Sequence, residues 1–288
     1  MATKTTMKKT KLDDIKVFMS AKSDIIFKLF FGDELNKDIL VEFLVAVLKL
    51  PLEEFLEIQI TDPHSKRKHK KDKLAVLDVK VKTKSGKIIN IEIQVVVTMR
   101  ERIVFYDSKL ITEQINSGDT HSVIKKVISI IITGERFIPE HEIYHDTFTF
   151  YSKKTNIELT DLIEIHTLEL PKLPEKSDGT NLWNWMKFIA ADSEEELKVL
   201  AKNAPQMNTP IEKLLELNQD SNARILFEAR EKQRRDNMDR EQHARLEGER
   251  IGIQNERIEM AKRLLKRNIP IEDIVGVTGF TIEYIKNL

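Results

Sequence analysis

Hydrophobic and polar residues alternate along two neighbouring segments, residues 73–83 and 88–96. Every second position is aliphatic from 77 to 81 and from 89 to 95, and a two-residue period is typical of a β-strand with one buried face. These aliphatic positions are Leu77, Val79, Val81, Ile89, Ile91, Ile93 and Val95. Between the segments lies Lys84-Ser85-Gly86-Lys87, in which Gly86 can adopt a left-handed conformation. The pattern therefore predicts an antiparallel hairpin that buries one aliphatic face.

Helical and strand patterns follow one another through the rest of the first 175 residues. Apolar residues at helical spacing predict helices at 23–32, 36–50 and 101–116. Short apolar runs predict further strands at 58–61, 127–133, 144–151 and 163–170. Residues 127–133 are nearly all β-branched, so we expect that strand to be buried on both faces. Because a helix connects it to the hairpin, the right-handed crossover rule predicts that it runs parallel to 88–96.

Four regions are expected along the chain. Residues 1–19 form a polar lead-in, and residues 20–175 hold the α/β pattern. Residues 176–260 are helix-forming and densely charged, and residues 261–288 have the pattern of a small helix-turn-helix-like unit. Charges of mixed sign are typical of a solvated helix or a coiled-coil seam. We therefore expect packing, or a homodimer through the C-terminal helices, rather than DNA reading by the last unit alone.

The composition narrows the class of protein. The 288 residues are 41% hydrophobic, which is enough to bury a core and excludes wholesale disorder. Lys+Arg 47 balance Asp+Glu 47, so any nucleic-acid binding must come from a local patch. Cysteine is absent, which excludes disulfides and thiolate chemistry and fits a reducing cytoplasm. The longest apolar run is too short for a membrane span, so we expect a cytoplasmic protein with no membrane partner.

Two acids on the hairpin are candidates for chemistry. If the aliphatic faces are buried together, Asp78 and Glu92 share the other face, and a three-residue loop 84–86 places them opposite each other. Their Cβ atoms would then lie ~5 Å apart. Two carboxylates so close repel each other unless a cation lies between them, and oxygen-only ligation suits Mg²⁺ or Mn²⁺. The alternative is an ordinary solvated sheet face on which Lys80 and Lys82 balance the acids.

A set of short motifs resembles a known family. The motifs are Asp24-Ile25-Ile26-Phe27-Lys28-Leu29-Phe30-Phe31-Gly32, Leu77-Asp78-Val79-Lys80, Asn90-Ile91-Glu92-Ile93-Gln94, Leu168-Glu169-Leu170-Pro171-Lys172 and Ile271-Glu272-Asp273-Ile274. In this order they resemble the Rpn family of recombination-promoting nucleases, or putative transposases, within the PD-(D/E)XK superfamily. The resemblance implies an α/β, restriction-endonuclease-like core with a mixed central sheet flanked by helices, followed by an all-helical C-terminal region.

The resemblance also implies metal-dependent hydrolysis of DNA phosphodiester bonds. Asp78 matches the first acid of the family motif and Glu92 the second, while Gln94 occupies the position of its lysine. The implied metal ligands are Asp78, Glu92 and Asp24, with Mg²⁺ as the ion and Mn²⁺ or Ca²⁺ as alternatives. Gln94 can orient a water but cannot act as a base, so deprotonation would rest on the metal or on Lys80. For Asp24, an i,i+4 pair with Lys28 at a helix start is the structural alternative.

Basic residues and one tyrosine on both sides of the hairpin are candidates for binding the DNA backbone. The basic residues are Lys66, Arg67, Lys68, Lys70, Lys71, Lys73, Arg102 and Lys109, and the tyrosine is Tyr106. Phosphate contacts of this kind add affinity without sequence information. Solubilising charge is the alternative for residues 66–73, and a core-edge aromatic with a solvated lysine is the alternative for Tyr106 and Lys109. Two functions follow, a Mg²⁺-dependent DNA endonuclease or a non-catalytic DNA-binding or interaction protein that keeps the nuclease fold.

Overall fold

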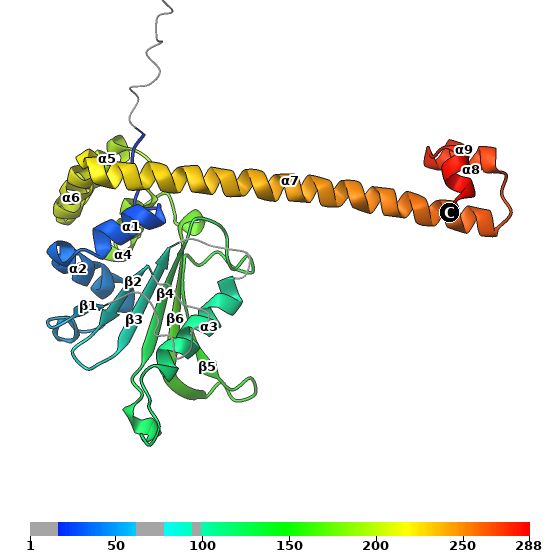
Figure 1. The fold of residues 1–288 in the computed structure, drawn as a ribbon. Coiled ribbons are helices and arrows are strands. Elements are labelled where there is room, and N and C mark those ends of the chain that lie inside the picture. Colours follow the sequence, from blue (N-terminus) through cyan, green and yellow to red (C-terminus); the bar gives the residue numbers. More distant parts are fainter. Residues whose placement is uncertain (1–16, 62–77, 94–98) are drawn as a thin grey trace, which may run out of the picture. The chain divides into compact units, whose positions relative to one another are not determined.

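Six strands form one mixed sheet in the order β1-β2-β3-β4-β6-β5 (Figure 1). The structure is a computed structural model, and it describes residues 17–61, 78–93 and 99–288. The strands are β1 Gln59–Thr61, β2 Val79–Lys82, β3 Ile88–Ile93, β4 Val127–Thr133, β5 His145–Tyr151 and β6 Glu158–Glu169. The pairs β1–β2, β2–β3 and β5–β6 are antiparallel, whereas β3–β4 and β4–β6 are parallel. The mixed sheet predicted from the sequence is thus confirmed.

The hairpin β2–β3 has the predicted register. Val79 pairs with Ile91 and Val81 with Ile89, so the paired residue numbers have an even sum. The loop contains three residues, 84–86, and is closed by a hydrogen bond from the Thr83 amide to the Lys87 carbonyl. Gly86 has φ +89°, the left-handed conformation that the loop requires. Burying the aliphatic face of both strands is therefore enough to set this register.

A single helix, α3 (Met99–Thr112), connects β3 to β4. The crossover places β4 parallel to β3, as predicted, and all seven residues of β4 are buried. The helix ends at Thr112 rather than near residue 116, because a turn begins at Glu113. Strand β6 begins at Glu158, five residues before the predicted start, since it continues its pairing with β5.

The aliphatic face of the sheet packs against α1 (Asp24–Phe31), α2 (Lys37–Leu48) and α4 (Asn181–Ala190). An aromatic cluster fills this layer: the Phe31 and Phe43 rings lie 5.2 Å apart, and Trp185 packs edge-on to Phe43 at 5.7 Å. Gly32 caps the C-terminus of α1. Lys49 caps the C-terminus of α2 in a left-handed conformation, two residues before Pro51.

The same core extends beyond the first 175 residues. Helices α5 (Glu194–Asn203) and α6 (Asn208–Gln219) and the start of α7 (Ser221–Lys266) contribute to it, ending with Ala223 and Phe227. The described residues up to Phe227 therefore form one compact unit, and its core crosses the boundary that we expected near residue 175.

Residues 228–288 form a second unit. Here the end of α7 packs against α8 (Ile271–Thr278) and α9 (Ile282–Lys286) around Ala261, Ile274 and Ile285. Gly279 ends α8 in a left-handed conformation, and the Thr281 hydroxyl caps α9. In the three described ranges, none of the helices combines the length and apolar character needed to cross a membrane.

Candidate active site

The opposite face of the hairpin carries Asp78 and Glu92. Asp78 directly precedes β2, and continuing the register from Val79–Ile91 places it opposite Glu92. The Ile93 backbone amide donates a hydrogen bond to Asp78 Oδ2 at 2.9 Å. Around the acids this face is not solvated, because α3 covers it: Asn90 and Glu92 are both buried, whereas Lys82 farther along β2 is exposed. The alternative of a charge-balanced, solvated face is therefore wrong.

Burial makes both carboxylates reluctant to ionise. The pKa of Glu92 is raised to about 8, first by burial and then by the negative charge of Asp78, while Arg102 opposes the rise. The pKa of Asp78 is also raised by burial, against the Ile93 amide and the positive charge of Lys28. Asp24 at the start of α1 adds to the rise in the pKa of Asp78, so its charge acts at this site as well. Three acids thus share one region, and a cation there would relieve their repulsion.

Two basic side chains approach the carboxylates, one from each flanking helix. Lys28 Nζ of α1 lies 3.6 Å from Asp78 Oδ1. Arg102 Nη2 of α3 lies 3.2 Å from Glu92 Oε2. Arg102 is held by Tyr106, whose hydroxyl accepts from Nε at 2.8 Å and whose ring lies 4.9 Å from the guanidinium carbon. The structure therefore brings the predicted Arg102 and Tyr106 to the acids and adds Lys28, which the sequence indicated only as a partner of Asp24.

Two other predicted basic residues point elsewhere. Lys80 Nζ lies 3.5 Å from Glu113 Oε2, just beyond the end of α3. We therefore assign Lys80 to that ion pair, and the expectation that it approaches the Asp24 region with the two acids is not supported. Lys109 Nζ lies 5.9 Å from the centre of the Phe105 ring. Gln94 and the basic residues Lys66, Arg67, Lys68, Lys70, Lys71 and Lys73 lie outside the described residues.

A buried polar layer beneath α3 was not predicted. Ser129 Oγ of β4 donates to Asp107 Oδ1 of α3 at 2.5 Å and lies 3.5 Å from Asn90 Nδ2 of β3. Burial raises the pKa of Asp107 to about 6. Across the described ranges, Asn90 Oδ1, Asp107 Oδ2 and Glu92 Oε1 are buried without a hydrogen-bond partner. In the sequence, this layer is indicated by Ser129, which interrupts the aliphatic residues of 127–133.

Gln114, which the resemblance includes and which we expected to be a helix-surface amide rather than a ligand, has a structural role. Its Oε1 accepts from the Lys125 amide at 2.7 Å, and its Nε2 donates to the Lys125 carbonyl at 3.1 Å. The side chain thus fastens the segment before β4 to the end of α3. Gln114 therefore supports the helix that carries Arg102 rather than contacting the acids itself.

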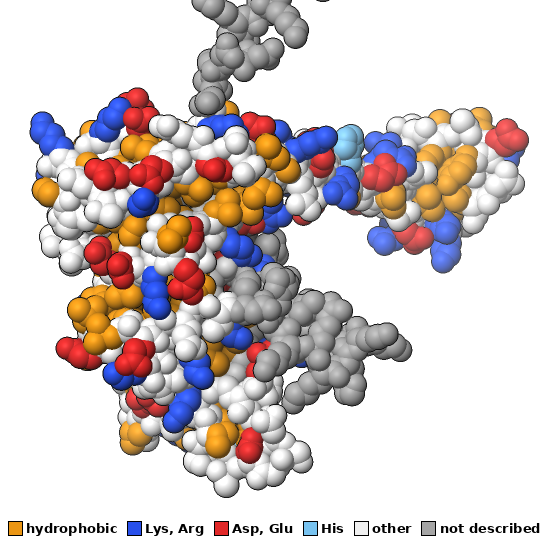
Figure 2. Space-filling model, turned by 60° about the vertical axis from the view of Figure 1, so that its left-hand side comes forward, with side chains coloured by type: hydrophobic (Ala, Val, Ile, Leu, Met, Phe, Trp, Pro, Cys, Tyr) orange, Lys and Arg blue, Asp and Glu red, His pale blue; other side chains and the backbone are white. Residues whose placement is uncertain are grey.

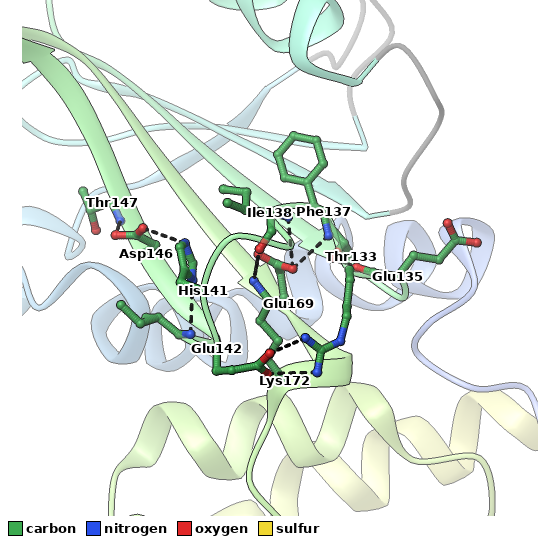
Figure 3. Close-up of polar contacts among 12 residues, drawn as sticks. Thr133, Glu135, Phe137, Ile138, His141, Glu142, Asp146, Thr147, Glu169 and Lys172 are labelled. Carbon is green, nitrogen blue, oxygen red and sulfur yellow. Dashed lines mark hydrogen bonds and ion pairs between the residues drawn. The ribbon is translucent and has the colours of Figure 1, made fainter.

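A buried ion pair, Glu169 with Lys172, holds the loop that follows β4 (Figure 3). Lys172 Nζ lies 2.7 Å from Glu169 Oε1 and donates to the Ile138 carbonyl, while Glu169 Oε2 accepts from the Phe137 amide at 2.8 Å. Phe137 in turn packs against the small cluster of Met99 and Ile103 of α3 and Ile131 of β4. The pair therefore holds a loop whose aromatic side chain buttresses the first turn of α3.

The acids fit a hard divalent cation. Across the part of the chain that the structure describes, no group of three or more His, Asp or Glu side chains has the geometry of a metal site. Mg²⁺, however, is commonly held by only one or two carboxylates together with water and substrate phosphates. The pair Asp78 and Glu92 meets that requirement, and the unpartnered Glu92 Oε1 supplies a buried acceptor.

On the face visible in Figure 2, basic and acidic side chains are interspersed. An anionic ligand on this face would therefore meet positive charge only at individual side chains rather than over a broad basic surface.

Comparison with known proteins identifies a family. A family model described as "PD-(D/E)XK nuclease family transposase" matches residues 21–244. No curated protein and no solved structure matches the chain. The matched segment contains the hairpin, both acids, α3 and the helices that cover the sheet. The chain therefore belongs to the PD-(D/E)XK nuclease family of transposases.

Proposed function

We propose that this protein is a Mg²⁺-dependent DNA endonuclease that acts in recombination or mobile-element movement. The observation that carries the proposal is the pair Asp78 and Glu92, opposed across two adjacent strands and largely withdrawn from water. Family membership supports a nuclease, and the oxygen donors support a hard cation.

Each side chain of the site has a proposed part. Asp78 and Glu92 would hold the ion, with Asp24 adding negative charge beside Asp78. A bound Mg²⁺ supplies the charge that polarises the scissile phosphate and makes a neighbouring water more acidic. Arg102 has donors suited to a phosphate oxygen, and Tyr106 holds it in place. Gln94 would orient the attacking water without acting as a base.

The contacts with DNA outside the acids are also proposals. Residues 66–73, which precede Asp78, would bind the backbone through their Lys and Arg side chains. Lys109 would add a further phosphate contact on the exposed side of α3. We also propose that the protein works in the cytoplasm and that a homodimer would form through its C-terminal helices.

Cleavage of supercoiled plasmid tests the proposal. We expect nicking or cutting with Mg²⁺ or Mn²⁺ and none with EDTA. Asp78→Asn and Glu92→Gln should each lower the rate by at least about a hundredfold, because each removes one charged metal ligand. Glu158→Gln, which changes an exposed acid at the start of β6, is the matched control and should cleave like the wild type. Equal cleavage by all four proteins would refute the proposal and indicate a contaminating nuclease.

The second candidate function is binding of DNA without cleavage. Gln94 in the lysine position favours it, because an amide cannot accept a proton from water. Salt-sensitive DNA binding without cleavage under Mg²⁺, Mn²⁺ or Ca²⁺ would support this candidate over the first. A titration of all three ions with labelled duplex DNA separates the two functions in one experiment.

A further inference from the structure

Each acid of the site already has one basic partner, and the two partners come from different helices. Lys28 reaches Asp78 from α1, and Arg102 reaches Glu92 from α3. The acids are mostly buried, with 14% of the Asp78 side chain and 4% of the Glu92 side chain exposed. Their partners are more open, at 36% for Lys28 and 35% for Arg102. The basic side chains therefore lie on the solvent side of the acids.

A divalent cation and these side chains compete for the same oxygens. Lys28 faces Asp78 Oδ1 and Arg102 faces Glu92 Oε2, the atoms through which each acid could bind a metal. A guanidinium stays protonated at any ordinary pH, so it cannot give up its charge to make room. Its like charge would repel the cation unless the side chain moved. Binding of a metal would thus require both ion pairs to open.

Released basic side chains would meet a phosphate. Arg102 is tied to Tyr106 through Nε, so its Nη atoms can leave Glu92 while the rest of the side chain keeps its anchor. A guanidinium binds phosphate oxygens in a two-pronged geometry, and a lysine binds them as a point charge. A DNA phosphate drawn to the metal would lie close to both.

We propose that Lys28 and Arg102 are counter-ions of the two acids that a divalent cation displaces and that then bind the DNA phosphate. This proposal rests on the proposed function, because it takes the two acids to be the metal site. It predicts that metal and DNA each strengthen the binding of the other, since by linkage the coupling must be reciprocal. Lys28 thereby becomes a substrate-binding residue of the site.

Calorimetric titration with MnCl₂, in the absence of DNA, tests the competition. Arg102→Gln and Lys28→Gln should each bind Mn²⁺ more tightly than the wild type, on the order of tenfold, because a like charge beside the ion is removed. Arg100→Gln removes a charge from the first turn of α3, where Arg100 lies over Phe137 rather than an acid, and should leave Mn²⁺ binding unchanged.

Binding of a short DNA duplex in Ca²⁺ tests the second half. We expect Ca²⁺ to tighten DNA binding by the wild type. For Arg102→Gln, the tightening of DNA binding by Ca²⁺ should be at least several-fold smaller. Unchanged or weaker Mn²⁺ binding by both Gln variants would overturn the counter-ion role. The role would also be overturned if Ca²⁺ tightened DNA binding by Arg102→Gln as much as it does for the wild type. If Glu92→Gln binds Mn²⁺ as the wild type does, or the wild type does not bind it, the metal site itself fails and the proposed function fails with it. Thermal unfolding followed by circular dichroism establishes that each variant is folded.

Discussion

The backbone amide of Ile93 donates a hydrogen bond to the side chain of Asp78 across the end of the hairpin. Ile93 directly follows Glu92, so this bond ties one acid to the strand that carries the other. It also lowers the pKa of Asp78 against the effect of burial. The spacing of the two acids is therefore supported by the backbone as well as by the side chains around them.

Replacement of Asp78 should separate the structural bond from the charge. Asp78→Asn keeps an oxygen that can accept from the Ile93 amide and removes a buried charge, so we expect it to be at least as stable as the wild type near pH 7. Asp78→Ala leaves the amide without its partner and should be less stable than Asp78→Asn by about 1 kcal/mol. Urea unfolding of both variants measures the difference. Equal stability of the two would show that the hydrogen bond contributes nothing.

The buried Asp107 should make stability depend on pH. Its pKa is about 6 in the folded chain and 3.8 without burial, so folding takes up a proton between these values and stability falls as pH rises through them. Asp107→Asn does not titrate and can still accept from Ser129. It should match the wild type near pH 4 and exceed it by about 3 kcal/mol above pH 7, since each pKa unit corresponds to about 1.4 kcal/mol. Urea unfolding at both pH values gives this difference directly, and a constant difference between the proteins would contradict the assignment.

Glu169 and Lys172 should behave as a unit. Glu169→Gln leaves the Lys172 ammonium buried beside a neutral group, and Lys172→Met leaves the carboxylate in the same position. We expect each to destabilise the fold by about 3 kcal/mol, because an uncompensated buried charge remains. The double variant should lose clearly less than the sum of the two. Trp183 and Trp185 lie in the same core, so their fluorescence reports the unfolding, and simple additivity would argue against coupling.

Gly86 should be the sensitive glycine of the hairpin. An alanine there would adopt φ +89°, and its Cβ would lie 3.4 Å from the Lys125 side chain. We expect Gly86→Ala to destabilise the fold by about 1 kcal/mol, as a forced left-handed residue does. Gly134→Ala is the matched control, since nothing lies within 4 Å of a Cβ there and φ is not in the left-handed region. A shift in melting temperature for Gly134→Ala as large as that for Gly86→Ala would refute the conformational explanation.

The sequence predicts the hairpin well because its information is local. Alternation along β2 and β3 permits only one way to bury Val79, Val81, Ile89 and Ile91 together, and that parity places Asp78 opposite Glu92. The buried strand β4 is equally clear from its β-branched residues. In both cases a short stretch of chain contains everything that decides the outcome.

The surroundings of the acids could not be predicted in the same way. Whether the polar face of β3 meets water or a helix depends on where α3 crosses, and no alternation along β3 encodes that. The partners of Lys80 and Lys28 could not be predicted either. Lys80 pairs with Glu113 beyond the end of α3, and Lys28 reaches Asp78 from a helix about fifty residues earlier in the chain. Long flexible side chains choose partners only after the helices have been placed.

The two faces of β3 also imply how this protein could lose its chemistry over time. Ile89, Ile91 and Ile93 contribute volume to the core, whereas Asn90 and Glu92 contribute charge and polarity beneath α3. Selection for folding alone would preserve the large apolar side chains at 89, 91 and 93, whereas at 90 and 92 it would require only side chains that fit beneath α3. A descendant that kept the fold only for binding would therefore vary mainly at positions 90 and 92 of this strand. Saturation mutagenesis of β3, scored for both solubility and DNA cleavage, should show the same difference between these two positions and the isoleucines.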